Sequence, residues 1–382
     1  MLRMNLLRKK VKPVGKLLNS IVDRSITTIE FPFNYSGNLI KPYTFYGCTN
    51  LDFSSLPDSL TTMGYYCFGQ CTSLKSLKAL PSSLKAVSQG CFYNCTSLAI
   101  SALPTSVTQI YSYAFYNCSK VTISSLNSNI TAIGAYAFYG CTGITPASLP
   151  TNLTRVENYT FYGCTSLRLI SLPANLTYIG YYAFYNCSRI KLTSFPSGIT
   201  TIGYYAFCNC KNISAISLPT SLTAMGYYAF RGCTNLALTS LPSGLTTIAQ
   251  ACFADCTNLA ITSLPPNLKI IYGDAFYDCT SIKALTLPDT LTQLYYRAFR
   301  GCTNLVIDTI PAKVTDIGNY CFYLCNAITS ITFKGTPTGT ISSTAFNGAA
   351  NLKNIYVPWS EGKVANAPWG ATNATIHYNS TV

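Results

Sequence analysis

Charged side chains are scarce in this chain. Asp, Glu, Lys and Arg make up 10% of its 382 residues, and the one histidine is His377, close to the end. General acid–base catalysis needs converging titratable groups, whereas the twelve acidic residues are scattered. The nearest to a pair is Asp274 with Asp278, which we interpret as a solvated turn. With no Gly-rich phosphate loop or nucleophile elbow in addition, the sequence argues against an enzyme and predicts no cofactor.

Long apolar runs are also missing. No stretch approaches the roughly 20 apolar residues that a membrane span needs, so we expect no membrane-spanning segment. No apolar segment follows the basic residues near the start, so no signal peptide is evident. This is awkward for a conventional secreted adhesin. It fits a protein made in the cytoplasm and released by lysis, as phage structural proteins are.

What the chain does contain is one repeat written many times. Phenylalanine recurs every 23 residues, as from Phe115 to Phe138, with steps of 24 from Phe68 to Phe92 and from Phe322 to Phe346. A fixed period in this range is the signature of a solenoid. Such a fold stacks copies against their neighbours and offers one long surface.

Each copy must consist of short pieces joined by turns, because its apolar residues are 3 to 5 apart and fit neither a long helix nor a long strand. We expect Leu-Pro, as in Leu172-Pro173, to close a short strand, since proline cannot donate to the next ladder bond. We expect residues 182–187 to form a short helical turn. Glycines such as Gly134 and Gly203 suit a bend that needs a positive φ.

A typical copy reads Leu172-Pro173, Leu176-Thr177, then Ile179-Gly180-Tyr181-Tyr182-Ala183-Phe184-Tyr185-Asn186-Cys187 and Ile190. It resembles the BspA-type leucine-rich repeat, over about residues 26–357. Asn127 departs from the pattern by taking a proline position. The resemblance implies a right-handed leucine-rich-repeat solenoid of short β-strands and helical turns, mostly β. The tail, residues 355–371, is also similar to the closing segment of BspA-type repeat proteins encoded in phages and prophages of gut bacteria.

The 18 cysteines are explained by the repeat. Thirteen share one position, which predicts a stacked row of buried thiols that act as small apolar side chains. These thirteen are Cys48, Cys71, Cys95, Cys118, Cys141, Cys164, Cys187, Cys210, Cys233, Cys256, Cys279, Cys302 and Cys325. No metal site is expected, because Cys208 and Cys210 form the one close pair and no histidine accompanies them.

Three regions are predicted: a basic lead at 1–25, the solenoid at 26–332, and a terminal repeat with a cap at 333–382. Residues 1–24 carry seven basic residues and one acidic residue, a net charge of +6. The lead is either an anchor to an acidic partner, through Arg8, Lys9, Lys10 and Lys12, or a helical cap or solvated tail. The tail holds Trp359 and Trp369, which either cap the last coil or form a ligand-stacking pair.

Tyrosine is unusually frequent, with 29 copies. Two positions of the repeat form rows, one represented by Tyr182, Tyr205 and Tyr228, the other directly after the phenylalanine. The rings either pack on one another or recognise a ligand. Arginines interrupt the rows at Arg231, Arg297 and Arg300, and arginine with tyrosine is typical of binding hot spots. These six residues are the candidate binding site.

Another position diverges from copy to copy, as expected of a recognition surface. It holds Thr62, Ala86, Gln109, Ala132, Arg155, Tyr178, Thr201, Ala224, Thr247, Ile270, Gln293 and Asp316.

The sequence therefore predicts a non-enzymatic recognition or adhesion protein that binds a cell-surface glycan or protein, carried by a phage particle or a bacterial surface. The alternatives are a purely structural virion protein, a decoration or fibre component anchored by the basic lead to other virion proteins, and an intracellular partner-binding scaffold. The net charge of +14 favours anionic partners. Outside the lead the basic residues are spread without clusters, which argues against nucleic acid. An oligomer is compatible with all three.

Overall fold

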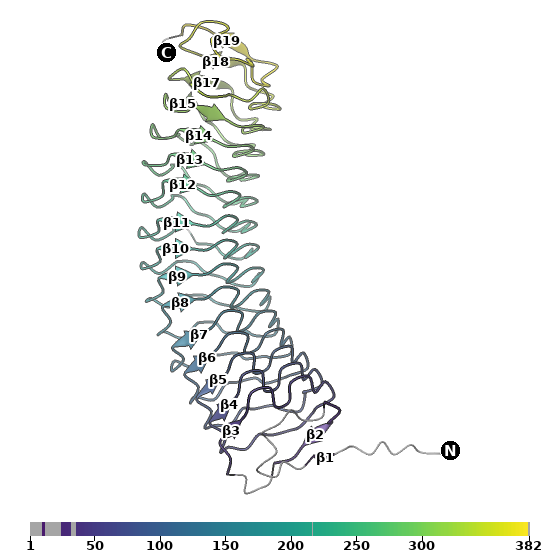
Figure 1. The fold of residues 1–382 in the computed structure, drawn as a ribbon. Helices are drawn as coiled ribbons and strands as arrows, with labels where there is room; N and C mark the ends of the chain where they lie inside the picture. Colours follow the sequence, from purple (N-terminus) through teal and green to yellow (C-terminus); the bar gives the residue numbers. More distant parts are fainter. Residues whose placement is uncertain (1–9, 12–23, 32–35, 216, 381–382) are drawn as a thin grey trace, which may run out of the picture. The chain divides into compact units, whose positions relative to one another are not determined.

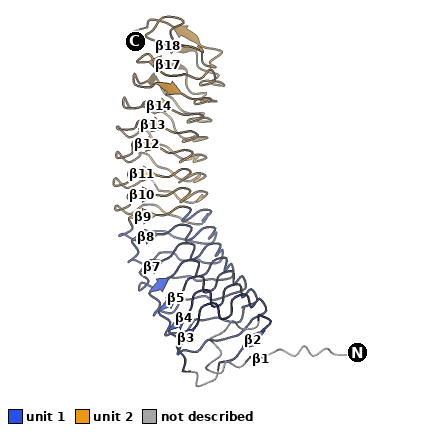
Figure 2. Cartoon of the chain, in the orientation of Figure 1, with its two compact units in different colours: residues 1–176, 182–189 blue, residues 177–181, 190–382 orange. Residues whose placement is uncertain are grey.

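The protein is a parallel β-solenoid, as predicted. The computed structural model describes residues 10–11, 24–31, 36–215 and 217–380, and none of these residues is in a helix. Each repeat forms one coil, and short strands of successive coils pair in parallel (Figure 1). The chain divides into two compact units (Figure 2). The N-terminal unit is Met1–Leu176 with Tyr182–Arg189, and the C-terminal unit is Thr177–Tyr181 with Ile190–Val382.

Nearly all strands are two residues long, one per coil. The N-terminal unit holds β1 (Lys10–Val11), β2 (Thr28–Ile29), β3 (Leu39–Ile40), β4 (Thr62–Met63), β5 (Ala86–Val87), β6 (Gln109–Ile110), β7 (Ala132–Ile133) and β8 (Arg155–Val156). The C-terminal unit holds β9 (Tyr178–Ile179), β10 (Thr201–Ile202), β11 (Ala224–Met225), β12 (Thr247–Ile248), β13 (Ile270–Ile271), β14 (Gln293–Leu294), β15 (Thr309–Ile310), β16 (Asp316–Ile317), β17 (Ser330–Phe333), β18 (Asn354–Tyr356) and β19 (Thr375–His377).

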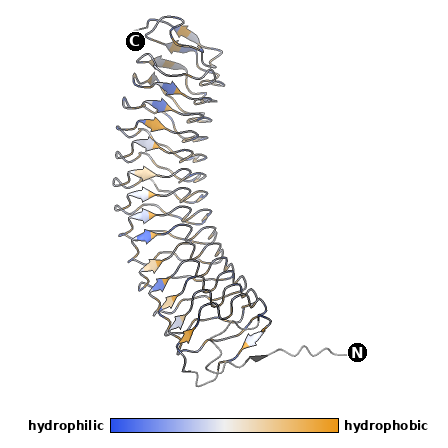
Figure 3. Cartoon of the chain, viewed as in Figure 1, coloured by the Kyte–Doolittle hydropathy of each residue, from blue (hydrophilic) through white to orange (hydrophobic). Residues whose placement is uncertain are grey.

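The repeated strand lies later in the coil than the sequence suggested. It covers the two residues before the glycine that recurs at one position of the repeat, as in Ala132–Ile133 before Gly134. A strand that ends at a Leu-Pro-type position occurs at β15, where Thr309–Ile310 precedes Pro311. In β4 to β14 and β16 the second residue is buried and the first points outward. These outward residues are the divergent position of the repeat, so the strand face changes hydropathy from coil to coil (Figure 3).

The segment around each phenylalanine is a series of i→i+3 turns whose amides alternate in direction. Ala114 and Tyr116 donate their N–H within the coil, to the carbonyls of Tyr111 and Tyr113. Phe115 N–H donates to the next coil, to the carbonyl of Ala137 at 2.8 Å. This alternation places two residues per coil, such as Tyr113 and Asn117, at φ of 60° and 56°. A bulky residue in this region costs of order 1–3 kcal/mol, which the surrounding bonds and ring contacts must offset.

The interior is a stack of phenylalanine rings beside a stack of thiols. Phe115 and Phe138 lie parallel with ring centroids 5.4 Å apart, and all 18 cysteines are at most 3% exposed. The shared position of the thirteen cysteines thus predicted their burial correctly. They are more than small apolar groups, because Cys141 Sγ donates to the carbonyl of Phe115 in the previous coil at 3.0 Å. Burial raises the pKa of the Cys141 thiol well above its ordinary value.

The glycine after the repeated strand is required by close packing of coils. A Cβ on Gly134 would lie 2.5 Å from the backbone nitrogen of Ser112 in the previous coil. The positive φ predicted for this bend is instead found two residues later, at Tyr136. The glycine therefore has a different physical reason from the one inferred from sequence.

The last coils end in a longer sheet, in which β17, β18 and β19 pair in parallel after β15. Trp359 and Trp369 are buried beneath it, at 5% and 0% exposure, and Trp369 Nε1 donates to the carbonyl of Ala365. Both tryptophans are packed inside the C-terminal unit against Phe333, which favours the cap over the ligand-stacking pair.

Candidate functional site

In the N-terminal unit the two tyrosine rows are continuous between Tyr93 and Tyr185, whereas nearer its start Gly69 and Gly90 occupy row positions. In the first row Tyr113, Tyr136, Tyr159 and Tyr182 stack with ring centroids 4.5 to 4.7 Å apart. In the second row Tyr93, Tyr116, Tyr139, Tyr162 and Tyr185 stack at 4.5 to 4.8 Å. Each interior ring therefore has a neighbour on both faces. Burial, followed by the neighbouring phenols, raises the pKa of Tyr162 to about 12, so its hydroxyl is neutral at physiological pH.

In the C-terminal unit both rows are interrupted. Tyr205 stacks on Tyr228 at 4.5 Å, but the next coils place Ala251, Asp274 and Arg297 at the first-row position. The second row holds Arg231, Ala254, Tyr277 and Arg300 in successive coils. The coil with Ala251 and Ala254 thus lacks both rings. Two large side chains are missing from one level of the stack, which leaves space beside the neighbouring coils.

A cavity of about 440 Å³ occupies this interruption, and we call it the row-gap cavity. Its lining residues are Tyr228, Arg231, Ala251, Ala254, Asp255, Asp274, Tyr277, Asp278 and Arg297. Ala251 and Ala254, each 3% exposed, form its floor. The volume falls within the usual range of ligand pockets, about 300–1,000 Å³.

The row-gap cavity carries charges of both signs. Arg231 Nε lies 3.3 Å from Asp255 Oδ2, and a guanidinium nitrogen of Arg297 lies 3.0 Å from Asp274 Oδ2. Burial raises the pKa of Asp274 although Arg297 acts against the shift. The Arg231 guanidinium also lies 5.7 Å from the ring centroid of Tyr228. The cavity can therefore offer donors, acceptors and an aromatic edge to one ligand.

The third carboxylate, Asp278, has no salt bridge within 4 Å among the described residues. Burial, followed by the charge of Asp255, raises its pKa, and Arg300 acts against the shift. In other coils this position holds asparagine, such as Asn117 and Asn209. Further coils hold glycine there, such as Gly140 and Gly163, so the aspartate adds a negative charge to the cavity that the coil itself does not require.

Beside the rows of the C-terminal unit runs an exposed tyrosine ladder: Tyr181, Tyr204 and Tyr227. Their ring centroids are 4.9 and 5.1 Å apart, and their exposure is 42%, 44% and 44%. Tyr204 is stacked on both faces, so the ladder presents ring edges and hydroxyl groups to solvent.

The structure brings together three of the six predicted binding residues. Tyr228, Arg231 and Arg297 line the row-gap cavity. Tyr205 stacks against Tyr228. Arg300 lies outside the lining, with its guanidinium 5.4 and 5.0 Å from the ring centroids of Tyr277 and Tyr323.

The other predicted residues lie elsewhere. Tyr182 belongs to the closed rows of the N-terminal unit. Among the anchor residues, Lys10 begins β1, which pairs in parallel with β2. Arg8, Lys9 and Lys12 lie outside the described residues.

Sequence reasoning missed the three aspartates and the two alanines. Asp274 and Asp278 had been interpreted as a solvated turn, whereas both line the cavity. The available signal was the pairing of Ala251 and Ala254 in one copy. Only when both tyrosine positions are compared along successive copies does the loss of two rings at one level become visible.

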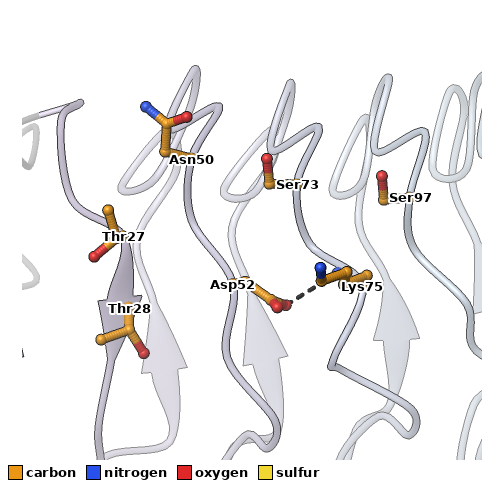
Figure 4. Close-up of a pocket in the computed structure, with 7 residues that line it drawn as sticks. All are labelled: Thr27, Thr28, Asn50, Asp52, Ser73, Lys75 and Ser97. Carbon is orange, nitrogen blue, oxygen red and sulfur yellow. Dashed lines mark hydrogen bonds between the residues drawn. The ribbon is translucent and has the colours of Figure 1, made fainter. Parts of the chain in front are cut away.

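A second cavity, of about 360 Å³, lies in the N-terminal unit and is lined by Thr27, Thr28, Asn50, Asp52, Ser73, Lys75 and Ser97 (Figure 4). Its carboxylate, Asp52, accepts bonds from the backbone nitrogens of Lys75 and Ser76 and from the Ser76 hydroxyl, at 2.7 to 3.0 Å. Burial raises the pKa of Asp52, but these bonds outweigh it, and the pKa is lowered. Asp52 thus ties adjacent coils together.

Within the described ranges, no group of three or more His, Cys, Asp and Glu side chains has a metal-binding arrangement. In the same part of the chain, no helix is long and apolar enough to cross a membrane.

Comparison with solved structures finds similar bacterial proteins. A leucine-rich repeat protein from Bacteroides ovatus has 25% sequence identity and a TM-score of 0.69, covering 89% of this chain and 87% of that one. A leucine-rich cell surface protein from Faecalibacterium prausnitzii has 24% identity and a TM-score of 0.49, covering 78% of this chain and 83% of that one. No curated protein matches.

The repeat itself matches a family described as the BspA-type leucine-rich repeat region, over residues 38–168, 131–260 and 246–367. Leucine-rich-repeat proteins are typically non-enzymatic scaffolds that recognise other macromolecules. With the coil, its buried Phe and Cys stacks and this match in agreement, the chain belongs to the BspA-type leucine-rich-repeat family.

Proposed function

We propose that this protein is a recognition or adhesion protein that binds a protein or glycan on a cell surface through the row-gap cavity. The observation that supports it most is the replacement of two stacked rings by a cavity that holds arginine, aspartate and tyrosine side chains. Where Gly69 and Gly90 interrupt the rows of the N-terminal unit, the rings of Tyr46 and Tyr66 pack against the glycines, whereas a cavity remains at Ala251 and Ala254. Arginine and tyrosine in a concave site are typical of binding hot spots.

The charge pattern indicates how such a target is held. Arg231 and Arg297 are paired with aspartates, but their side chains remain 49% and 39% exposed. Exposed pairs contribute only about 0–1 kcal/mol to folding, so they can exchange partners at low cost. A target with polar or charged groups can therefore bond to these side chains without disrupting the fold.

We further propose that the protein is displayed on a bacterial surface or a phage particle.

The test is attachment of the fluorescently labelled full chain to intact cells of a panel of gut bacteria. Arg231→Ala combined with Arg297→Ala removes two candidate hot-spot side chains. It should lower attachment at least about tenfold, which corresponds to a loss of about 1.4 kcal/mol of binding free energy. Ala251→Tyr restores a ring at the gap, should stack on Tyr228, and should block attachment while the melting temperature is kept. Tyr204→Ala, on the exposed ladder, is the matched surface control.

Protease treatment of the cells separates a protein target from a glycan target, because only the former is removed. Full attachment by both the arginine double variant and Ala251→Tyr would reject the row-gap cavity as the recognition site.

A further inference from the structure

Two grooves on the strand face, one in each unit, share one construction. In the N-terminal unit a groove of about 330 Å³ is lined by Gln109 and Tyr111 of one coil and by Ile133 and Gly134 of the next. In the C-terminal unit a groove of about 390 Å³ is lined by Gln293, Tyr295, Ile317 and Gly318 in the same positions. We call these the Gln–Tyr grooves. The same four residue types recur at the same spacing in both units, so the arrangement is not peculiar to a single coil.

In each groove a tyrosine of one coil and a glycine of the following coil line the same hollow. A Cβ on Gly134 would lie 2.5 Å from Ser112 N, and one on Gly318 would lie 2.5 Å from Tyr296 N, so no side chain fits there. Tyr111 is 48% exposed and has no aromatic partner among the described residues. Tyr295 is 37% exposed, its ring centroid lies 5.1 Å from that of Tyr272 in the preceding coil, and it lines the C-terminal groove together with Gly318. Both grooves thus contain a partly exposed tyrosine ring, whereas in the tyrosine rows the rings are stacked on one another.

Planar polar groups surround each aromatic surface. In the N-terminal groove the Tyr111 hydroxyl donates to Gln109 Oε1 at 2.5 Å, which leaves the amide nitrogen of Gln109 as a donor. Two coils along from β6, Arg155 Nε donates to Glu157 Oε1 at 3.0 Å, with side chains 52% and 36% exposed. These opposite charges balance, so the groove holds donors and acceptors without net attraction for an ion.

The C-terminal groove has a different set of polar groups, with the carboxylate of Asp316 and no lysine or arginine among its lining residues. Asp316 accepts bonds from the Thr315 hydroxyl at 2.6 Å and from Thr340 N at 3.0 Å. These bonds lower the pKa of Asp316, so the carboxylate is ionised at neutral pH. The carboxylate is held in place beside Gln293 and is an oriented acceptor at the edge of the groove.

We propose that each Gln–Tyr groove binds a pyranose ring of a saccharide. Such a ring presents an apolar C–H face, which stacks on an aromatic ring, and hydroxyls at its rim, which bond to amide, carboxylate and guanidinium groups in one plane. The volumes lie at the small end of ligand pockets, about 300–1,000 Å³, and suit one or two sugar units. The proposal rests on the proposed recognition function and adds a ligand class at a second location.

The test uses saturation-transfer NMR on the full chain with the methyl glycosides of glucose, galactose, mannose and N-acetylglucosamine and with their disaccharides. At least one sugar should receive saturation at its ring protons. Tyr111→Ala should remove about half of the sites in a titration, and Tyr111→Ala with Tyr295→Ala should remove both. Tyr204→Ala is the matched control, because Tyr204 is similarly exposed but stacked on both faces, and binding should not change.

Three results would overturn the saccharide sites: no sugar of the panel receives saturation, binding survives in the double variant, or Tyr204→Ala abolishes it equally. A groove that binds a peptide instead would show protease-sensitive cell attachment that depends on Tyr111 and Tyr295 without any sugar signal. A different result would reject the proposed function: cell attachment that is unchanged when Arg231 and Arg297 are replaced. Equal melting temperatures of all variants would show that the losses are losses of binding.

Discussion

The two units are built from the same coil but differ at the two tyrosine positions. In the N-terminal unit rings such as Tyr136 and Tyr139 have partners at 4.5 to 4.7 Å on both sides. In the C-terminal unit the same positions hold Ala251, Ala254 and charged residues around a cavity. The interior does not change, because Phe and Cys stack in both. The comparison teaches that the interior specifies the coil, while the outward positions are free to exchange stacked rings for a cavity with charged side chains.

The largest expected effect tests whether the interior is the same in both units. Phe138→Ala and Phe276→Ala each remove a ring that is at most 1% exposed and stacked on two neighbours. Each should lower the free energy of unfolding by about 3–5 kcal/mol, as large-to-small core changes do. Chemical denaturation of both variants gives the comparison. A difference above about 2 kcal/mol between them would mean that the two interiors are not equivalent.

An intermediate effect measures the tyrosine rows. Tyr139→Ala loses two stacked partners, at 4.6 and 4.5 Å, worth about 0.5–1.5 kcal/mol each beyond burial. Tyr277→Ala, at the same position in the C-terminal unit, loses a contact with the Arg300 guanidinium at 5.4 Å, worth about 0.5–1 kcal/mol. Thermal melting should therefore rank Tyr139→Ala as the more destabilising change. The reverse order would contradict the view that the N-terminal rows are closed by packing.

The smallest expected effect concerns charge. Asp278→Asn installs the residue that other coils carry, and it should raise stability at neutral pH by at most about 0.5 kcal/mol. The raised pKa of Asp278 means that the folded state binds the proton more tightly than the unfolded state. Its carboxyl therefore favours folding below the ordinary value of 3.8 and disfavours it as pH rises through the folded-state pKa.

Melting of both forms at neutral pH and near pH 3 checks the sign. The gain should disappear in acid, where the carboxyl of the parent protein is protonated in both states. A gain that persists at low pH would have to come from packing at this position.

The sequence predicts the solenoid because the 23-residue step of phenylalanine is a direct record of coil length. It places the strand wrongly, since Leu-Pro and Thr-x-Ile-Gly are both plausible strand ends and only the stacking of coils decides between them. The positive φ of tyrosines such as Tyr136 could not be predicted, because tyrosine rarely adopts it and the reason lies in bonds to the next coil. The Arg231–Asp255 and Arg297–Asp274 pairs join different coils, so they become visible only when copies are aligned side by side.

The buried row of cysteines has a consequence for where such a protein can work. Oxidation proceeds through the exposed thiolate, and here burial raises the pKa of Cys252 to about 12 and that of Cys208 to about 11. At most 3% of any cysteine is exposed. A coil must therefore open locally before an oxidant can react with its thiol. The folded chain can carry 18 thiols through aerated surroundings, and their modification should report how often the coils open.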